Sequence, residues 1–465
     1  MKPIVILFFL GVISAPIFSV EPVKNQSDED FVKEKKTEKK TTTKSEPIQE
    51  DWELELDKDI EEVTKNSTEK KDTKNLGYPK IFPSPSIDRN VQNLMMDINA
   101  AIDLLGGWDK NKNKTTENNL DVRGAEIGFS GAVDQMIRGN LLIAAHNENG
   151  EYVFEIHEAN AVFPFLLKQV TVKAGKMFLD LGRLNRIHQH DWVFSTAPIV
   201  HSKLMDKEAI QDTGAEFNIL LPWQKLTQEI VIGATNGRSW GHSHSAGSPK
   251  NNPMSYIHLK NFYYIGNNWG TQFGLTAIRY EPDSNSNKTI RTQYGADFLL
   301  RWNRSFLKSF MLMGEVWYRE TRYPDGFDLL TFQRTKTPME TQVGYYIFAD
   351  YQFHEQWSLG FRFDYFTIPN LRNKQGFLAE NSEMAYTPQV TFKPSEFSFI
   401  RLSFERRYSK DLTIGSSAYS VKSNEEWIKE YTENPNSQTS KPQMVTYQVY
   451  LQCTFILGSH PPHAY

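Results

Sequence analysis

The chain has 465 residues, a formal net charge of −4, 39% hydrophobic residues and 13% aromatic residues. A charge so close to neutral does not indicate binding to nucleic acid, and no nucleic-acid partner is expected. A mean hydropathy of −0.53 combined with many aromatic side chains is unusual for a compact soluble enzyme and typical of a transmembrane β-barrel, in which only alternate residues face lipid.

The chain begins with "MKPIVILFFLGVISAPIFSV". Lys2 followed by an apolar run from Ile4 to Ile13 predicts a secretory signal peptide over residues 1–19, cleaved near Ser19. The run is too short to span a bilayer comfortably, and no later stretch of 18 or more apolar residues occurs, so no helical membrane span is expected. The single cysteine, Cys453, is given no redox role.

Residues 20–87 are dominated by charged and hydroxyl side chains, as in "DFVKEKKTEKKTTTKSEP". Such a segment has too little apolar surface to offset the entropy of ordering, so we predict a mostly disordered periplasmic tether. A short helix starting at Asp51 is the one interruption. The tether is interpreted as a solvated spacer, with contact to anionic lipid or cell-wall polymer as the alternative.

From residue 88 the chain alternates between apolar and polar side chains. In "NLMMDINAAIDLL" the even positions from Leu94 to Leu104 are apolar, whereas Asp97, Asn99 and Asp103 form the opposite face. A period of two predicts a β-strand with one apolar and one polar face. Its length of about 10 residues or more fits a tilted transmembrane strand.

The same pattern recurs to the end of the chain. Strands are predicted near 93–105, 121–133, 138–147, 151–161, 168–180, 213–221, 227–235, 255–264, 269–281, 290–303, 308–322, 338–353, 356–367, 383–393, 397–408 and 443–457. Short connections alternate with long polar ones, as in outer-membrane barrels. The predicted fold is therefore all-β: a transmembrane antiparallel barrel of about 16 strands over residues 88–465, with a periplasmic or secreted β-sandwich as the alternative.

The connection from 181 to 212 contains the stretch "GRLNRIHQHDWVF". If both termini are periplasmic, this connection is the third external loop. In general porins that loop folds into the lumen, so we expect this segment to form a constriction. Five arginines are expected on the lumen wall, either biasing anion passage or balanced by nearby acids: Arg138, Arg279, Arg301, Arg362 and Arg401.

Seven of the eleven histidines fall in three clusters of loop or tail residues. Imidazole is a good ligand for zinc, copper and nickel, and His-x-His presents two rings together. The candidate metal ligands are His188, His190, Asp191, His201, His242, His244, His460 and His463. The alternative is that these histidines are ordinary residues of solvated loops. No cofactor is required on this interpretation, and any zinc is bound weakly, because no cysteine thiolates complete a tight site.

Catalysis is not expected. His190, Asp191 and Ser195 include the residue types of a triad, but nearness in sequence does not create its geometry. The chain has no nucleophile elbow, zinc-protease motif or phosphate loop. We therefore predict that the protein has no catalytic residues and is not an enzyme.

Two stretches carry a family resemblance. "GRLNRIHQHDWVFSTAPIV", followed by "GAEFNILLP", and the ending "LGSHPPHAY" resemble segments of bacterial outer-membrane proteins described as zinc-regulated TonB-dependent receptors. More distantly, the chain is similar to the phosphate-selective porin superfamily. The resemblance covers roughly residues 88–465 and implies an outer-membrane barrel linked to zinc-responsive expression.

The length of chain after residue 87 suits about 16 strands, not a larger barrel with a plug. The expected function is a porin-like outer-membrane channel for small solutes, favouring divalent metal ions or their complexes. The alternatives are a non-conducting receptor for metal or a metal carrier, and a structural or adhesive surface protein. Expected partners are outer-membrane lipids, the barrel-assembly machinery and, by analogy with porins, two further copies in a homotrimer.

Overall fold

A computed structural model describes residues 96–458 of the chain. Its gaps are 110–118, 149–150, 206–207, 223–225, 239–251, 267, 283–288, 306–307, 324–325, 329–332, 336–338, 370–381 and 411–442. The predicted signal peptide and tether, the histidine pair His242 and His244, and the tail pair His460 and His463 lie outside the described residues. The prediction for each of these therefore stays a prediction.

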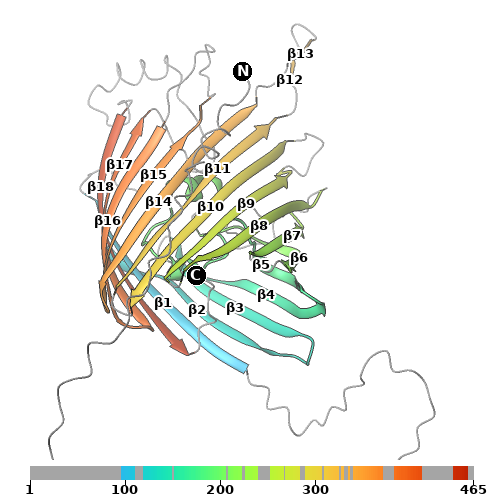
Figure 1. The fold of residues 1–465 in the computed structure, drawn as a ribbon. Coiled ribbons are helices and arrows are strands. Elements are labelled where there is room, and N and C mark those ends of the chain that lie inside the picture. The colour runs from blue at the N-terminus through green and yellow to red at the C-terminus, as the bar shows by residue number, and fades with distance from the viewer. Residues whose placement is uncertain are drawn as a thin grey trace, which may run out of the picture. The chain divides into compact units, whose positions relative to one another are not determined.

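The described strands form one closed antiparallel barrel, in which β1 pairs with β18 to complete the ring (Figure 1). Each strand is hydrogen-bonded to its neighbours in sequence order, apart from a small separate hairpin between β11 and β14. The barrel strands are β1 (Met96–Asp109), β2 (Asn119–Ala132), β3 (Arg138–Glu148), β4 (Glu151–Leu167), β5 (Val170–Phe178), β6 (Gln211–Leu221), β7 (Thr227–Thr235), β8 (Met254–Ile265), β9 (Trp269–Tyr280), β10 (Ile290–Ser305), β11 (Lys308–Arg322), β14 (Glu340–His354), β15 (Trp357–Thr367), β16 (Ser382–Ser395), β17 (Ser398–Lys410) and β18 (Gln443–Gly458).

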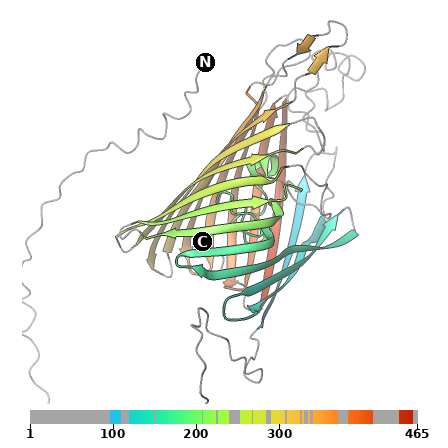
Figure 2. The same cartoon turned by 90° about the vertical axis from the view of Figure 1, so that its right-hand side faces the viewer.

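The predicted fold is confirmed: sixteen strands close into a barrel among the described residues, each within a few residues of its predicted position. The sandwich alternative is therefore wrong. The sequence did not predict the hairpin of β12 (Gly326–Asp328) and β13 (Gln333–Thr335), which lies beyond the barrel rim (Figure 2). These three-residue strands are too short to show a period of two.

The alternation of side chains along each strand explains why the sheet closes. On β1, Ile98 is 53% exposed and faces outward, whereas Asn99 and Asp103 are 6% and 4% exposed and face inward. Many other large apolar side chains project outward in the same way, including Ile127, Phe217, Ile257, Leu275, Phe361 and Leu402. An apolar outer wall of this extent needs hydrocarbon around it, and closure leaves no unpaired strand edge in the bilayer. Across the described ranges, no helix has the length and hydrophobicity to cross a bilayer.

Residues 179–210 connect β5 to β6 and are called the insert below. Its described residues, 179–205 and 208–210, lie inside the ring of strands (green in Figures 1 and 2). The insert contains the 3-10 turn η2 (Gln189–Asp191) and the short helix α2 (Ile199–Leu204). Trp192 and Phe194 are fully buried. Phe194 packs edge-on against Tyr346 and Phe348 of the wall, and Trp192 packs against Phe194 and His201 within the insert. The prediction that the third loop folds into the lumen is confirmed.

Candidate metal centre

The insert enters the lumen at Gly182, where the chain passes close to β11. Gly182 has φ +62°, and a Cβ atom there would lie 2.7 Å from Trp317 and 3.1 Å from the Glu315 carboxylate. Its N–H donates to the Thr276 hydroxyl at 3.1 Å. Only glycine accommodates both the left-handed backbone and this close approach.

Asn185 ties the beginning of the insert to its end. Its side-chain Nδ2 donates to the carbonyls of Leu179 at 2.8 Å and Ile210 at 3.1 Å, and its Oδ1 accepts from the Ile210 N–H at 2.7 Å. The side chain is fully buried, so it satisfies backbone groups that water does not reach. This amide therefore reinforces the backbone hydrogen bond from the Leu179 N–H to the Ile210 carbonyl, which joins the same two ends.

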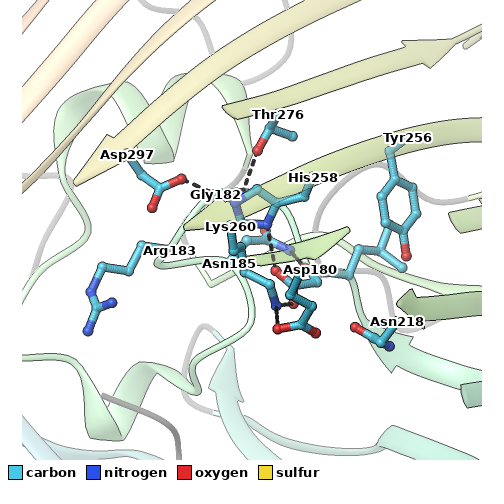
Figure 3. Close-up of polar contacts among 12 residues, drawn as sticks. Asp180, Gly182, Arg183, Asn185, Asn218, Tyr256, His258, Lys260, Thr276 and Asp297 are labelled. Carbon is cyan, nitrogen blue, oxygen red and sulfur yellow. Dashed lines mark hydrogen bonds and ion pairs between the residues drawn. The ribbon is translucent and has the colours of Figure 1, made fainter. Parts of the chain in front are cut away.

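A buried ionic network fastens the insert to β8 and β10 (Figure 3). Asp180 accepts from His258 at 2.7 Å and from the Lys260 ammonium at 2.6 Å, and the other nitrogen of His258 lies 3.2 Å from Asp297. Burial alone would raise the pKa of the Asp180 carboxyl, but Lys260 and the His258 hydrogen bond outweigh burial. The pKa of Asp180 therefore lies well below its ordinary value.

Two lumen arginines hold the opposite side of the insert. Arg401 donates to the Trp192 carbonyl at 3.1 Å, and Arg362 donates to the Thr196 hydroxyl at 3.0 Å. Asp364 on β15 accepts from the Ile199 N–H at 3.1 Å. Arg362 and Arg401 thus position backbone instead of facing open water. The insert is fastened to strands on several sides of the barrel.

Four histidine rings lie in a row between the wall and the insert. His146 comes from β3, His157 from β4, and His188 and His190 from the insert. The ring centroids are 4.7 Å apart from His146 to His157, 6.3 Å from His157 to His188, and 5.7 Å from His188 to His190. Successive planes differ by 24°, 24° and 28°, so the rings are nearly parallel.

His157 reaches this row because β4 contains a bulge. The register against β3 shifts between Leu142, which pairs with Glu158, and Ile143, which pairs with Ile156, so His157 is the extra residue. A bulge re-aims side chains. Here it lets the consecutive residues His157 and Glu158 both line lumen cavities.

Three glutamates interleave with the rings. The Glu126 carboxylate on β2 lies 3.4 Å from Nδ1 of His157 and 3.3 Å from Nδ1 of His188. Glu155 lies 2.7 Å from Nε2 of His157, and Glu208 of the insert lies 3.5 Å from Nδ1 of His146. Imidazole nitrogen and carboxylate oxygen are the donor types that zinc and related divalent ions use.

These side chains form two groups whose ligand atoms lie within 4.8 Å of one another. One group comprises His146, Glu155, His157 and Glu208, and the other comprises Glu126, His157 and His188. Atoms bound to one tetrahedral zinc ion at about 2.0–2.1 Å are separated by about 3.3 Å. The two groups, together with the neighbouring His190 and Asp191, are called the cluster below. The distances between nitrogen and oxygen atoms within the two groups are close to 3.3 Å, so these residues fit a metal ion.

The cluster lines two adjoining cavities. A small cavity of about 20 Å³ is bordered by His146, His157, His188, His190 and Glu126, among others. A larger cavity of about 250 Å³ lies between strands β1–β5 and the insert and shares Glu126 and His188 with the first. The second cavity is also bordered by the cations Lys173 and Arg186. The larger cavity therefore borders the cluster at Glu126 and His188.

The structure distributes the predicted ligands unevenly. His188 and His190 lie at the cluster, and His190 is 3.6 Å from Glu126 and 3.3 Å from Asp191. Burial lowers the pKa of His190, but the two carboxylates outweigh it and raise that pKa well above its ordinary value. His201 lies on α2, with its ring edge-on against Trp192. Of the predicted ligands among the described residues, only His188 belongs to one of the two groups, whereas His190, Asp191 and His201 belong to neither.

His146, His157, Glu126, Glu155 and Glu208 were not predicted. All of them except Glu208 lie on strands, where they resemble the ordinary polar residues of a lumen wall. They come together only when the strands pair and the barrel closes. One local signal was present in "EIHEANAV", where the two consecutive polar residues His157 and Glu158 interrupt the alternation. Such an interruption indicates a bulge, and bulges are frequent next to functional sites.

Comparisons with known proteins define the class. No protein-family model matches the chain. An uncharacterized protein of Aquifex aeolicus is 26% identical over 285 residues, covering 55% of this chain and 57% of that relative. The anion-selective porin from Comamonas acidovorans has a TM-score of 0.50 at 8% identity, covering 78% of this chain and 99% of its own. The outer-membrane channel DcaP of Acinetobacter baumannii has a TM-score of 0.48 at 10% identity, with coverages of 78% and 97%.

The fold is thus that of the outer-membrane porins: a sixteen-stranded barrel, apolar outside, with the connection from β5 to β6 folded inside. The protein is an outer-membrane β-barrel. At 8% identity the likeness to the Comamonas porin shows the fold alone.

Proposed function

We propose that the protein is a porin-like channel for small solutes, narrowed by the insert, and that it favours divalent metal ions or their complexes. The observation that carries this proposal is the position of the cluster. The two cavities between the insert and the wall share Glu126 and His188, so a solute using this route meets imidazole and carboxylate ligands. Several weak positions in succession permit binding without trapping.

Charge supports the preference for cations at this point. Glu126, Glu155, Glu208 and Asp191 contribute four carboxylates within the cluster. In a region of low dielectric, such a set attracts a divalent cation or, in its absence, keeps neighbouring imidazoles protonated. Anions would instead meet the cations of the larger cavity and then be repelled at the cluster.

A receptor that binds metal without conducting is the second candidate. It is favoured by the many bonds that fasten the insert, including those of Asn185, Arg362 and Arg401 to its backbone. An insert held in this way is a fixed partition, and the residual cavities then serve as a binding site.

Planar-bilayer recordings of the purified, refolded protein, with and without zinc, distinguish the two. Discrete open-channel steps that zinc blocks support the proposed channel. A silent barrel that binds zinc supports the receptor, and steps unaffected by zinc contradict the metal preference. Chemical cross-linking in detergent tests the accompanying proposal that the barrel assembles as a homotrimer.

A further inference from the structure

Resting on the proposed function, we propose that the cluster provides two neighbouring divalent-cation positions that share the imidazole of His157. The wall position comprises His146, Glu155, Glu208 and Nε2 of His157. The insert position comprises Glu126, His188 and Nδ1 of His157. An ion passes from one position to the other across a single ring.

The wall position has a full set of four protein ligands. Nε2 of His157 lies 2.7 Å from Glu155 and 2.8 Å from Nε2 of His146, and Nε2 of His146 lies 3.7 Å from Glu155. Glu208 of the insert lies 3.5 Å from Nδ1 of His146, and all four residues offer ligand atoms within 4.8 Å of one another. Four protein ligands match the number that a tetrahedral zinc ion takes.

The insert position has three protein ligands. Glu126 lies between His157 at 3.4 Å and His188 at 3.3 Å, using a different carboxylate oxygen for each. Three protein ligands leave a fourth place for water or an incoming solute, as in exchangeable zinc sites. Glu126 and His188 also border the larger cavity, so the open place is accessible from it.

His157 connects the two positions because its two nitrogens face different partners. Nδ1 faces Glu126, and Nε2 faces Glu155 and His146. Ions bound at about 2.0–2.1 Å to opposite nitrogens of one ring are separated by roughly 6 Å. When both positions are filled, the ring of His157 is an imidazolate, and each of its N–H protons has been released to solvent as an ion bound.

Formal charge also favours two ions. Glu126, Glu155, Glu208 and Asp191 carry four negative charges, which balance two divalent cations. Asp191 contacts His190, which in turn lies 3.6 Å from Glu126. Asp191 therefore offsets positive charge near the insert position but is not one of its ligands.

The test measures zinc bound per chain by equilibrium dialysis of the full-length protein folded in detergent. Wild type is expected to bind two zinc ions per chain, with the second bound more weakly because of cation repulsion. His188→Ala is expected to retain one, His146→Ala to retain one, and His157→Gln to lose both. His354→Ala is the matched control, because His354 is an exposed histidine at the end of β14, and this variant should bind two ions.

Loading the protein with copper(II) tests independently whether two ions share the ring of His157. Two copper ions on one imidazolate couple magnetically, so the integrated EPR signal of the loaded wild type should fall below its copper content. His188→Ala should restore a signal equal to the copper bound. Heat-dependent gel mobility reports barrel folding and identifies any variant that is merely unfolded. In that case His146→Gln replaces His146→Ala, and His157→Ala replaces His157→Gln.

One zinc ion per chain in wild type, or loss of only one ion in His157→Gln, would overturn the shared position. A full copper signal at two ions per chain would do the same. These outcomes are distinct from failure of the channel, because binding is measured without conductance. A barrel that conducts but binds no zinc overturns the two metal positions and the metal preference but not the channel, and one that binds two ions without conducting overturns the channel alone.

Discussion

Oε2 of Glu126 on β2 lies 3.3 Å from Nδ1 of His188 on the insert, joining the barrel wall to the third loop at the cluster. Glu126 also lies close to His157 and His190. Replacing Glu126 with Gln removes the negative charge while keeping the shape. Because loss even of a group that only supports a ligand costs about 10–100-fold in metal affinity, we expect zinc to bind at least about tenfold more weakly.

Isothermal titration of folded protein with zinc measures this change. Glu158→Gln is the matched control, since Glu158 borders the larger cavity but is absent from both groups of ligands. Equal affinity in Glu126→Gln and wild type would show that Glu126 is not a ligand.

Asn185→Ala should loosen the insert while leaving the barrel closed. The substitution removes the acceptor of the buried Ile210 N–H, whereas the carbonyls of Leu179 and Ile210 each keep a backbone hydrogen bond. A buried unsatisfied group costs about 1–3 kcal/mol. The freed insert should sample more than one position, which predicts larger and noisier conductance steps in planar bilayers.

Asn218→Ala is the control for that experiment. Asn218 lies on β6 and donates to the Glu216 side chain at 3.1 Å, without contacting insert backbone in the described contacts. If Asn185→Ala gave conductance steps as steady as those of this control, the hydrogen bonds of Asn185 would not set the shape of the insert.

The sequence was sufficient to predict the barrel because the lipid and the lumen each impose a rule on alternate residues. Ile98 and Asp103 obey that rule, and so do the strands that follow. The third loop was also predictable from strand order. Neither inference required knowledge of which residues meet across the lumen.

The cluster was only half predictable for the same reason. His188 and His190 stand out because they are close in sequence, whereas His146 and His157 meet them only after the strands pair and the loop folds inward. The bulge at His157 depends on its register with β3, which is a property of the pair of strands. Nearness in sequence was misleading for His201, which lies in the same loop as His188 and His190 but packs against Trp192.

The ionic contact at Asp180 should make stability depend on pH in one direction. The pKa of Asp180 is lowered in the folded protein from an ordinary value of 3.8, so its stabilising effect is complete above about pH 4 to 5. The effect is lost as pH falls through the lower, folded pKa. Asp180→Asn should therefore lower the unfolding midpoint at pH 7, and the difference from wild type should shrink in strong acid.

Unfolding of both proteins by guanidinium, followed by tryptophan fluorescence from pH 7 down to pH 3, measures this difference. The titratable groups around Asp180 include His258 and Lys260 of β8 and Arg186 of the insert, with Asp297 of β10 behind His258. They also include Lys173 of β5, Glu216 of β6 and Tyr256 of β8. A difference that stayed constant from pH 7 to pH 3 would contradict a role for the ionised carboxylate.

Gly182→Ala separates backbone strain from steric clash at the point where the insert enters the lumen. Gly182 has φ +62° and little space for a Cβ atom beside Trp317. Gly266, in the turn after β8, has φ +60° and no atom within 4 Å of a Cβ. Both alanine variants incur the cost of a left-handed backbone, about 1–2 kcal/mol, but only Gly182→Ala also displaces its neighbours. We therefore expect the larger loss of unfolding free energy in Gly182→Ala, with altered conductance in that variant alone. Equal losses in the two variants would mean that the insert adjusts freely at Gly182 and is not held against β11.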